Sequence, residues 1–420
     1  MSFSPAIATT INWLRGRFSD YYVDNPCPLP DRFTRREFGF ILWPEKPGPP
    51  PFLRHRSFRS GNDLHSEMIR RGPHSAYYST AYYRRPGEAR MADKEWLGAE
   101  LIFDLDADHL QAVEAAKAAG SEMAIADQLA QVKEQFKRLL DEFLLGDLGI
   151  DEKDLWITFS GGRGYHCHVT DSRFVALDNK ARREIVDYIT GKVPTQQGTD
   201  LPDLDVFIQR ETIGMRGRGE YAKAMQRERL PSVNAYGWQG RITRSLVSVL
   251  RVEVMDKEPK DAIRFLTGLQ GIGQKGAQDL VDKLDETMLA RISEGYLEQG
   301  NVVKRVCHHI LRQSAIPMAR GETDEPVTAD VKRLIRLPGS LHGKTGLSVV
   351  VLTRDEVDDF EPLRDAVAFS QDLVRIKPRI SQTVTLGGKS VAVTEAEEID
   401  IPEAHAVWIL ARQGGTIVLD

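Results

Sequence analysis

Cysteine is scarce in this chain of 420 residues. Its three cysteines, Cys27, Cys167 and Cys307, lie far apart, and none belongs to a Cys-x-x-Cys pair. This spacing argues against a disulfide framework and against a zinc site made of four neighbouring cysteines. We therefore expect the protein to work in a reducing, cytoplasmic environment.

Long hydrophobic runs are also missing. Apolar stretches such as residues 347–352 have the length of a β-strand, whereas a helix that crosses a bilayer needs about 20 apolar residues. Residues 1–7 contain neither a basic start nor an apolar core, so we expect no secretory signal. The sequence therefore predicts no association with a membrane.

The composition is that of a folded protein. Hydrophobic residues make up 41% and charged residues 28% of the chain, with 34 glycines and 21 prolines. These values exclude a disordered, collagen-like or coiled-coil chain. The length suffices for one large domain, or for about two or three domains of ordinary size.

Basic residues are in the minority, but they are unevenly distributed. Lys and Arg number 56 against 61 Asp and Glu, a net charge of -5, which by itself argues against a nucleic-acid-binding protein. Residues 51–90, however, contain eight arginines against three acidic residues, and residues 205–251 contain nine basic residues against four acidic ones. One such block is typical of a solvated surface, but two blocks in an acidic protein favour contacts with phosphate groups.

Hydrophobic periodicity predicts strands and helices in an irregular alternation. In the first half we expect a helix at 4–22, strands at 38–43, 52–58, 100–106, 155–159 and 165–170, and helices at 110–146 and 178–190. In the second half we expect a mixed helical region at 205–312, strands within 333–352, and a tail of short strands with a helix at 402–412.

This order favours an α/β (α+β) fold, in which mixed sheets are flanked by helices and interrupted by a helical insertion. We divide the chain into an N-terminal helix, the first part of a core, a mainly helical insertion, and the second part of the core with a C-terminal segment. The predicted ranges of these four parts are 1–24, 25–195, 196–312 and 313–420.

Asp104 and Asp106 stand two residues apart in a predicted strand, so both side chains leave the same face. Two carboxylates this close repel each other unless a cation lies between them. A hard divalent cation is such a partner, because it prefers carboxylate oxygens and keeps positions open for phosphate oxygens. The pair therefore predicts a metal site of the kind used in phosphoryl transfer. Asp108 continues the alternation, and we expect it beyond the strand end as a supporting or capping residue.

A glycine-rich turn joins the next two strands. It reads Ser160-Gly-Gly-Arg163-Gly-Tyr-His166. Glycines let the backbone approach a ligand and present N–H groups to it, and arginine is a permanently charged donor suited to phosphate oxygens. Serine, arginine and histidine together favour a phosphate-binding turn over an ordinary β-turn with an exposed arginine.

A second segment rich in basic residues follows the predicted insertion. Asp324 precedes Arg336, which opens the sequence Arg-Leu-Pro-Gly-Ser-Leu-His342-Gly-Lys344-Thr-Gly. Its Pro, Gly and Ser residues mark turns, which bring Arg336, His342 and Lys344 close enough to bind a polyphosphate. The alternative is a surface hairpin with ordinary solubilising charges.

The order of these motifs resembles that of the small catalytic subunit of archaeal and eukaryotic DNA primases. Residues 36–40, 53–58 and 77–79 also look like the opening segments of that family, nearer to its archaeal form. The resemblance covers most of residues 30–175 and 315–352, and its motifs are specific in combination.

The resemblance implies a metal-dependent nucleotidyltransferase that makes short RNA primers, and in archaea often DNA primers, on a single-stranded DNA template. Asp104 and Asp106 match the paired metal-binding aspartates of the family and Asp324 its third, for Mg²⁺ or Mn²⁺ in a two-metal mechanism. The residues that match positions holding the nucleoside triphosphate are Ser160, Arg163, His166, Arg336 and His342, and Glu37 and Arg54 resemble further pocket positions. The family also pairs with a large, iron–sulfur-bearing subunit, so we expect a heterodimer.

Two departures from the family pattern matter. The family usually has a Cys/His zinc knuckle after the aspartate strand, whereas residues 109–127 offer only His109. We therefore expect no structural zinc and a helix in its place. The second departure is Gly162, where eukaryotic members carry another arginine, so one phosphate contact is either missing or supplied elsewhere.

Other readings of the sequence stay open. Residues 269–277 resemble the hairpin of helix-hairpin-helix modules, whose backbone N–H groups meet DNA phosphates, although a purely structural turn explains them equally well. The whole chain also fits a primase-like polymerase that acts in repair without a large subunit, or a non-catalytic replication scaffold. A glycosyltransferase with paired aspartates is a remote reading, since it leaves the turn at 160–166 unexplained.

Overall fold

The computed structural model describes residues 2–118, 123–195, 198–200, 204–216, 223–297 and 301–419. Its contacts divide the chain into two compact units. Unit 1 contains residues 1–140, 150–186 and 322–420, and unit 2 contains residues 141–149 and 187–321. Unit 2 thus interrupts unit 1 in the sequence, and the residues that we predicted as a helical insertion, 196–312, all fall within unit 2. Every predicted site residue lies in unit 1.

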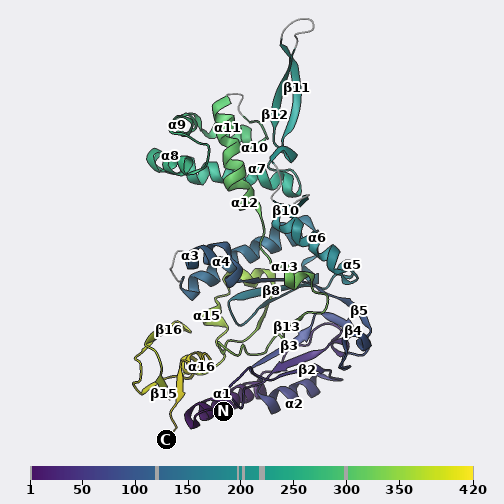
Figure 1. The fold of residues 1–420 in the computed structure, drawn as a ribbon, viewed down its shortest axis with the longest axis vertical. Helices are drawn as coiled ribbons and strands as arrows, with labels where there is room; N and C mark the ends of the chain where they lie inside the picture. The colour runs from purple at the N-terminus through teal and green to yellow at the C-terminus, as the bar shows by residue number, and fades with distance from the viewer. Residues whose placement is uncertain are drawn as a thin grey trace. The chain divides into compact units, whose positions relative to one another are not determined.

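Two four-stranded antiparallel sheets form the centre of unit 1 (Figure 1). The first has the order β13-β3-β1-β2, with bounds Leu334–Arg336, Ser75–Ser79, Phe38–Ile41 and Phe52–Arg56. The second has the order β14-β7-β8-β6, with bounds Val350–Leu352, Leu155–Phe159, Gly164–Val169 and Leu101–Asp106. The predicted strands of the first half are therefore confirmed, each within a few residues of its expected bounds.

The segment that follows unit 2 contributes one strand to each sheet. β13 pairs with β3, with Arg336 opposite Tyr77, and β14 pairs with β7. Residues 337–349 therefore pass from the edge of one sheet to the edge of the other. This crossing segment, residues 337–349, contains His342 and Lys344, so the fold holds both residues between two rigid sheets.

Helices cover these sheets and extend from them. The described helices of unit 1 before residue 370 are α1 Pro5–Asp24, α2 Gly61–Arg71, α3 Gln111–Ala118, α4 Ile125–Arg138, α5 Ser172–Val175, α13 Glu325–Ala329, α14 Arg354–Asp359 and α15 Pro362–Asp365, and α6 Asn179–Thr190 begins in unit 1 and ends in unit 2. Leu14, Phe18 and Tyr22 recur on one face of α1 and are buried, which confirms the helical spacing predicted for residues 4–22. The short strands β4 Ala81–Tyr83 and β5 Trp96–Ala99 form a separate hairpin.

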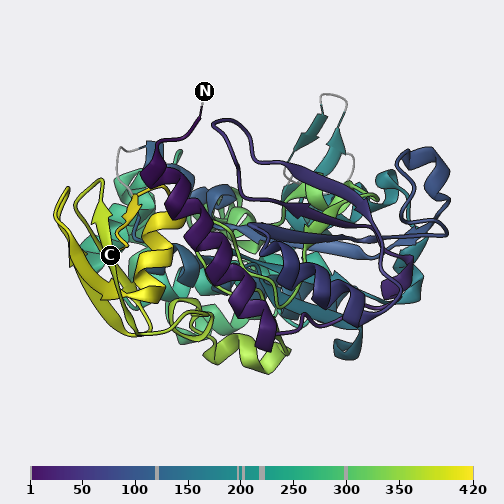
Figure 2. The same cartoon turned by 90° about the horizontal axis from the view of Figure 1, so that it is seen from below.

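The C-terminal segment folds around one buried helix. α16, Glu403–Ala411, is apolar around its whole circumference and is buried from Ala404 to Leu410, as expected for a helix enclosed on all sides. It packs against α1, as Figure 2 shows, and against the strands β15 Leu373–Pro378, β16 Gln382–Leu386, β18 Ile399–Pro402 and β19 Gly415–Ile417. β17, Lys389–Val393, pairs with β16.

Unit 2 is a helical body with its own apolar core. Its helices are α7 Gly237–Val249, α8 Pro259–Gly268, α9 Gln274–Lys283, α10 Glu286–Ser293, α11 Asn301–Ile310 and α12 Ile316–Ala319. It also contains two hairpins, formed by β9 Val193–Thr195 with β10 Gly198–Asp200 and by β11 Gln209–Arg216 with β12 Lys223–Arg229. The longer hairpin was not predicted, because its strands are mostly polar and show no apolar alternation.

The close approach of β6 and β8 generates a first prediction. Asp106 lies opposite Gly164, and a Cβ atom at residue 164 would collide with the Leu105 carbonyl oxygen and lie 3.0 Å from the Asp106 Cα. We expect Gly164→Ala to lower the free energy of unfolding by about 1–3 kcal/mol, because backbone atoms cannot move aside cheaply. Denaturant unfolding measures this change.

The control is Gly16→Ala in α1, where a Cβ atom meets nothing within 4 Å. This substitution should leave stability unchanged or raise it by up to about 1 kcal/mol, because alanine favours a helix interior. Equal stability of the two variants would contradict the prediction.

Candidate active site

Three acidic residues lie together at the end of β6. Asp104 and Asp106 project from the same face of this strand, with His166 and Gly164 opposite them on β8. Asp324 caps the N-terminus of α13, and its backbone N–H donates to the Asp104 carbonyl oxygen at 2.9 Å. The register of two strands and one backbone hydrogen bond therefore hold the three carboxylates in one neighbourhood.

The carboxylates repel one another. Burial, followed by the charges of Asp106 and Asp324, raises the pKa of Asp104 from 3.8 to about 7, although Arg333 and Arg336 oppose this shift. Among the residues that the structure describes, no three His, Cys, Asp or Glu side chains stand close enough to hold a metal ion as they are. The donors are nevertheless all carboxylate oxygens that carry excess negative charge, which is the chemistry that suits a hard divalent cation.

The glycine-rich turn uses part of its own hydrogen-bonding capacity. Ser160 is buried, and its Oγ accepts hydrogen bonds from the N–H groups of Gly162 and Gly164 at 3.2 and 3.3 Å. The expectation that the glycines present their N–H groups to a ligand is therefore wrong for these two residues in this structure. Gly161 has a φ of +73°, and a Cβ atom there would lie 2.8 Å from the His342 Cβ. Glycine is needed at this position because the crossing segment packs against the turn.

Arg163 extends from the turn toward the acidic residues. Its Nη2 forms an ion pair with the Asp108 carboxylate and lies 4.0 Å from Asp106 Oδ1. Asp108 also accepts a hydrogen bond from Lys117 at 2.8 Å, and its own backbone N–H donates to Asp106 Oδ1 at 3.0 Å. Asp108 therefore lies past the strand end, where we expected it, and holds Arg163 beside the carboxylates.

The remaining candidates come from β8, from β13 and from the crossing segment. His166 Nε2 lies 3.5 Å from Asp104 Oδ1, and burial lowers the pKa of His166 well below its usual value, so the imidazole is neutral. Arg336 lies over the Tyr77 ring, 5.3 Å from its centroid. His342 packs against the glycine-rich turn, and its Nδ1 is hydrogen-bonded to Thr345 Oγ1 at 3.1 Å.

Glu37 and Arg54 form a separate group. The Glu37 carboxylate is buried and pairs with Arg54 at 3.1 Å and with Lys94 at 3.4 Å, while it accepts a hydrogen bond from the His55 backbone N–H. In the part of the chain that the structure describes, no ion pair or hydrogen bond joins this group to Asp104, Asp106 or Asp324. The sequence analysis missed Lys94, and nothing in its sequence neighbourhood distinguishes it from a surface lysine.

The first basic block is largely neutralised within the fold. Six of its eight arginines form ion pairs with acidic residues, namely Arg54, Arg70, Arg71, Arg84, Arg85 and Arg90. A local charge counted along the sequence therefore overstates the positive field that a template would meet. Contact between these arginines and a DNA template stays a prediction.

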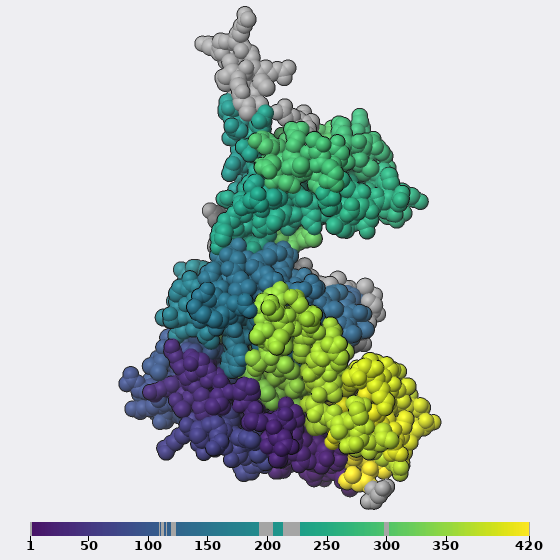
Figure 3. All heavy atoms as spheres, turned by 180° about the vertical axis from the view of Figure 1, so that it is seen from behind, coloured from purple at the N-terminus to yellow at the C-terminus, as the bar shows by residue number. Residues whose placement is uncertain are grey.

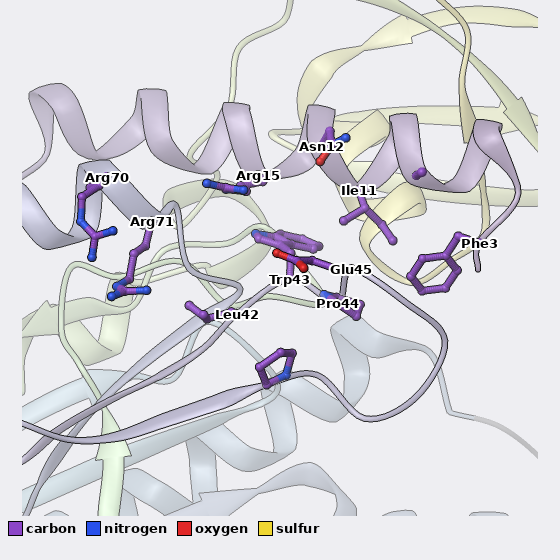
Figure 4. A pocket seen from close by; sticks show the side chains of 12 residues that line it. Phe3, Ile11, Asn12, Arg15, Leu42, Trp43, Pro44, Glu45, Arg70 and Arg71 are labelled. Carbon is purple, nitrogen blue, oxygen red and sulfur yellow. The ribbon is translucent and has the colours of Figure 1, made fainter. Parts of the chain in front are cut away.

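Two cavities lie near α1 rather than at the carboxylates. The larger, of about 430 Å³, is shown in Figure 4 and is lined by residues such as Arg15, Trp43 and Arg71. None of the predicted site residues lines it, so its size does not make it the active site. The second, of about 270 Å³, includes His74, Lys344 and residues 410–411 and 413 in its lining.

Comparison with known proteins gives this geometry a context. The family model described as DNA primase small subunit matches residues 103–354, a range that contains the three carboxylates, the glycine-rich turn and the crossing segment. Curated relatives named DNA primase small subunit PriS are similar along nearly their whole length. The chain is 37% identical to the protein of Methanococcoides burtonii, 39% to that of Methanothrix thermoacetophila and 37% to that of Haloarcula marismortui, over 95–96% of this chain and 96–98% of each relative.

The chain belongs to the DNA primase small subunit family. Neither the reading as a repair polymerase nor the reading as a scaffold is favoured by these relatives, all of which are named as primase subunits. Glu37, Arg54 and the C-terminal segment lie outside the range that the primase family model matches.

Two further segments discussed in the sequence analysis can be placed. α3, Gln111–Ala118, follows the aspartate strand and lies within residues 109–127, where the family usually has a zinc knuckle. α11, Asn301–Ile310, lies within the mixed helical region predicted for 205–312, and its Cys307 is buried in the core of unit 2. No described helix is long and apolar enough to span a membrane.

The helix-hairpin-helix-like motif does form two helices around a turn, α8 and α9. Gly271, in the turn, has a φ of +85°, and a Cβ atom there would collide with the His309 ring. Internal packing therefore explains this glycine, and contact of the turn with DNA phosphates stays a prediction.

A buried charged network anchors the start of β6. Glu100 pairs with Arg36 and His168, and its backbone carbonyl accepts from Arg182 at 2.7 Å. Burial alone would raise the pKa of Glu100, but the charge of Arg36 and the hydrogen bond from His168 outweigh it and lower the pKa to about 2. The carboxylate therefore stabilises the fold above its ordinary pKa of 4.5, and this stabilisation is lost as the pH falls from 4.5 toward 2.

We predict that Glu100→Gln destabilises unit 1 by roughly 3–5 kcal/mol at neutral pH, because it leaves Arg36 buried without a counter-charge. Denaturant unfolding at pH 7 and at pH 3 measures the effect, and the difference between variant and wild type should shrink at the lower pH. A constant difference at both pH values would contradict the assigned role of Glu100.

Removing the charge of Asp104 should stabilise the fold, whereas removing the charge of Glu100 should destabilise it. Because the folded carboxyl holds its proton more tightly than the unfolded one, Asp104 destabilises the metal-free fold as the pH rises from 3.8 through about 7. We predict that Asp104→Asn raises the free energy of unfolding by about 1–3 kcal/mol at pH 8 in the presence of a chelator, since one pKa unit corresponds to about 1.4 kcal/mol and the repulsion relaxes in part.

The matched control is Asp355→Asn, which removes an exposed carboxylate from the first turn of α14. We expect this control to change stability by less than about 0.5 kcal/mol. A loss of stability in Asp104→Asn would show that the Asp104 carboxylate is held by attraction and not by repulsion.

Proposed function

We propose that this chain is the catalytic subunit of a DNA primase, which joins nucleoside triphosphates into short RNA primers, or DNA primers, on a single-stranded DNA template. The observation that carries the proposal is the set of three acidic residues, Asp104, Asp106 and Asp324, beside a turn that contains serine, arginine and histidine. Membership of the primase small subunit family supports the same assignment.

The metal site of the proposed enzyme consists of Asp104, Asp106 and Asp324. The repulsion among these carboxylates, which contributes to the raised pKa of Asp104, would be relieved by a cation such as Mg²⁺ or Mn²⁺. When bound, two such ions would activate the attacking 3′-hydroxyl and stabilise the leaving pyrophosphate. The protein's own contribution is to fix the three carboxylates through the β6–β8 register and the hydrogen bond from Asp324.

The phosphate groups are held by the turn and the crossing segment. We infer that Arg163 and Arg336 neutralise the triphosphate, and that Ser160, His166 and His342 orient it through hydrogen bonds, so that catalysis is positioning and electrostatics. Neutral His166 can donate a hydrogen bond without adding charge. Arg163 is paired with Asp108, so an incoming triphosphate competes with Asp108 for its guanidinium. Glu37 and Arg54 belong to the same proposal as more distant pocket residues.

The proposed function implies a partner and a location. Starting a primer without an existing end requires two nucleotides to be held at once, with few contacts to the template. A large, iron–sulfur-bearing subunit is therefore expected to form a heterodimer with this chain. The basic residues of 54–90 and 205–251 would follow the template through phosphate contacts that weaken with salt. A primase that acts in DNA replication would work in the cytoplasm, which is where we expect this chain.

A template-directed assay with labelled nucleotides tests the proposal. We predict primer synthesis on bare single-stranded DNA that needs Mg²⁺ or Mn²⁺ and stops when a chelator is added. The double variant Asp104→Asn with Asp106→Asn should lose at least about 1,000-fold in rate, because the electrostatic stabilisation of the leaving group is removed. The assay is run with and without a co-purified large subunit.

Asp355→Asn again serves as the control and should keep wild-type activity. Primer synthesis that survives in the double variant would refute the assignment of the metal site. Extension of existing primers without any synthesis on bare template, even with the large subunit present, would instead favour a repair polymerase.

A further inference from the structure

The C-terminal segment packs directly against the crossing segment. A Cβ atom at Gly346 would lie 2.5 Å from the Val407 side chain of α16. The Ser348 backbone N–H donates to the Ala366 carbonyl at 2.9 Å, and Leu347 forms a β-bridge with Val367. Figure 3 shows the C-terminal residues, in yellow, beside the yellow-green residues that precede them. The end of α16 is therefore fixed relative to His342 and Lys344.

Arg412 immediately follows α16 and is held in one orientation. Its guanidinium carbon lies 3.5 Å from the centroid of the Trp408 ring, and its Nη1 donates to the Trp408 carbonyl at 3.4 Å. A cation on an aromatic face that also bonds to the preceding helical turn has lost much of its rotamer freedom. Its remaining donors are available, because no acidic side chain among the described residues forms an ion pair with Arg412.

Arg412 lies beside the crossing segment, because the residues on both sides of it, 410–411 and 413, line one cavity together with His74 and Lys344. Partial burial, followed by the charge of Arg163, lowers the pKa of Arg412 to about 10. Burial and then the charges of Arg336, His74, Arg412 and Lys344 lower the pKa of His342. Two residues from different parts of the site, Arg163 and His342, thus both feel the charge at the end of α16.

The basic residues of the site and of the end of α16 together favour binding of an anion. Arg163 is paired with Asp108, and Arg336 feels the negative charges of Asp104 and Asp106, but Lys344 and Arg412 form no ion pair with any acidic residue in the described ranges. Positive charges gathered with so few acidic partners repel one another, and a bound polyanion would turn this repulsion into attraction.

We propose that Arg412 is a further phosphate-binding residue of the nucleotide site and contacts the phosphates of the incoming nucleoside triphosphate, together with Arg163 and His342. The inference rests on the proposed function, because it assumes that a nucleoside triphosphate occupies this site. It assigns a role in substrate binding to the C-terminal segment, which lies beyond the residues matched by the family model. Trp408 acts as a positioning residue, since it holds the guanidinium of Arg412.

The test is steady-state kinetics of primer synthesis by the full chain, with its large subunit if the two co-purify. Arg412→Gln should raise the KM for nucleoside triphosphate by about 10-fold or more and change kcat by less than about 2-fold, because a charge-assisted hydrogen bond to the substrate is lost. Arg412→Lys keeps the charge and should recover part of the affinity. Inorganic tripolyphosphate should inhibit wild type more strongly than Arg412→Gln.

The matched control is Arg375→Gln on β15, an arginine of the same segment whose guanidinium pairs with Asp400 instead. This control should keep the wild-type KM and the wild-type inhibition by tripolyphosphate. If wild type makes primers but Arg412→Gln shows the same KM and inhibition as wild type, the inference about Arg412 is wrong and the proposed function stands. If wild type makes no primers with either metal, the proposed function itself fails.

A loss of stability in Arg412→Gln has its own discriminating measurement. Arg412→Lys keeps the cation above Trp408, and binding of tripolyphosphate to it can be compared with wild type by calorimetry. Binding weaker than wild type in a stably folded Arg412→Lys supports direct contact, because lysine cannot reproduce the planar, bidentate contact of arginine. Unchanged binding of tripolyphosphate in both variants would overturn the proposal.

Discussion

The register between β6 and β8 is the constraint on which the candidate site depends. It places His166 opposite Asp104 and Gly164 opposite Asp106. The acidic strand β6 is therefore held beside the glycine-rich turn, which leads directly into β8. A shift by one residue would turn both carboxylates toward the apolar core. The buried network of Glu100, Arg36 and His168 fixes the residue before β6 and so helps to hold this register. Stability stored in that network offsets the repulsion that the carboxylates create.

The return of the chain after unit 2 completes the site. β13 joins the first sheet and β14 the second, so the residues between them must cross from one sheet to the other. This crossing explains why glycine is required at positions 161 and 346, since His342 and Val407 occupy the space that a Cβ atom would need there. A large insertion between the two parts of the core is tolerated because loop length adds little to the entropy of closure, while both ends are tied into sheets.

Most of the fold and the grouping of the site could be predicted from the sequence, for identifiable reasons. Strands such as 101–106 have an apolar pattern with two charged exceptions, and those exceptions, Asp104 and Asp106, are the candidate metal ligands. Local motifs also placed Asp108 correctly beyond the strand end. The polar hairpin β11–β12 and the use of Gly162 and Gly164 N–H groups by Ser160 could not be predicted, because neither leaves a periodic or compositional signal. The ion pairs that neutralise the arginines of 54–90 were equally invisible, since their partners are set by tertiary contacts.

The position of Gly162 shows how the site can obtain its positive charge from elsewhere in the chain. A Cβ atom at Gly162 would lie 3.1 Å from His342 Nε2, so a side chain there would push His342 aside by a few tenths of an ångström. In this chain the turn supplies one arginine and leaves His342 in place. A cation attached to α16 avoids this conflict, because Arg412 approaches from the C-terminal segment and rests on Trp408. The net charge of the whole chain hides this arrangement, since the acidic residues at the end of β6 and the basic residues around Arg163 and His342 are gathered at one site. Such a site suits a substrate whose reacting end needs metal ions and whose phosphates need fixed positive charge.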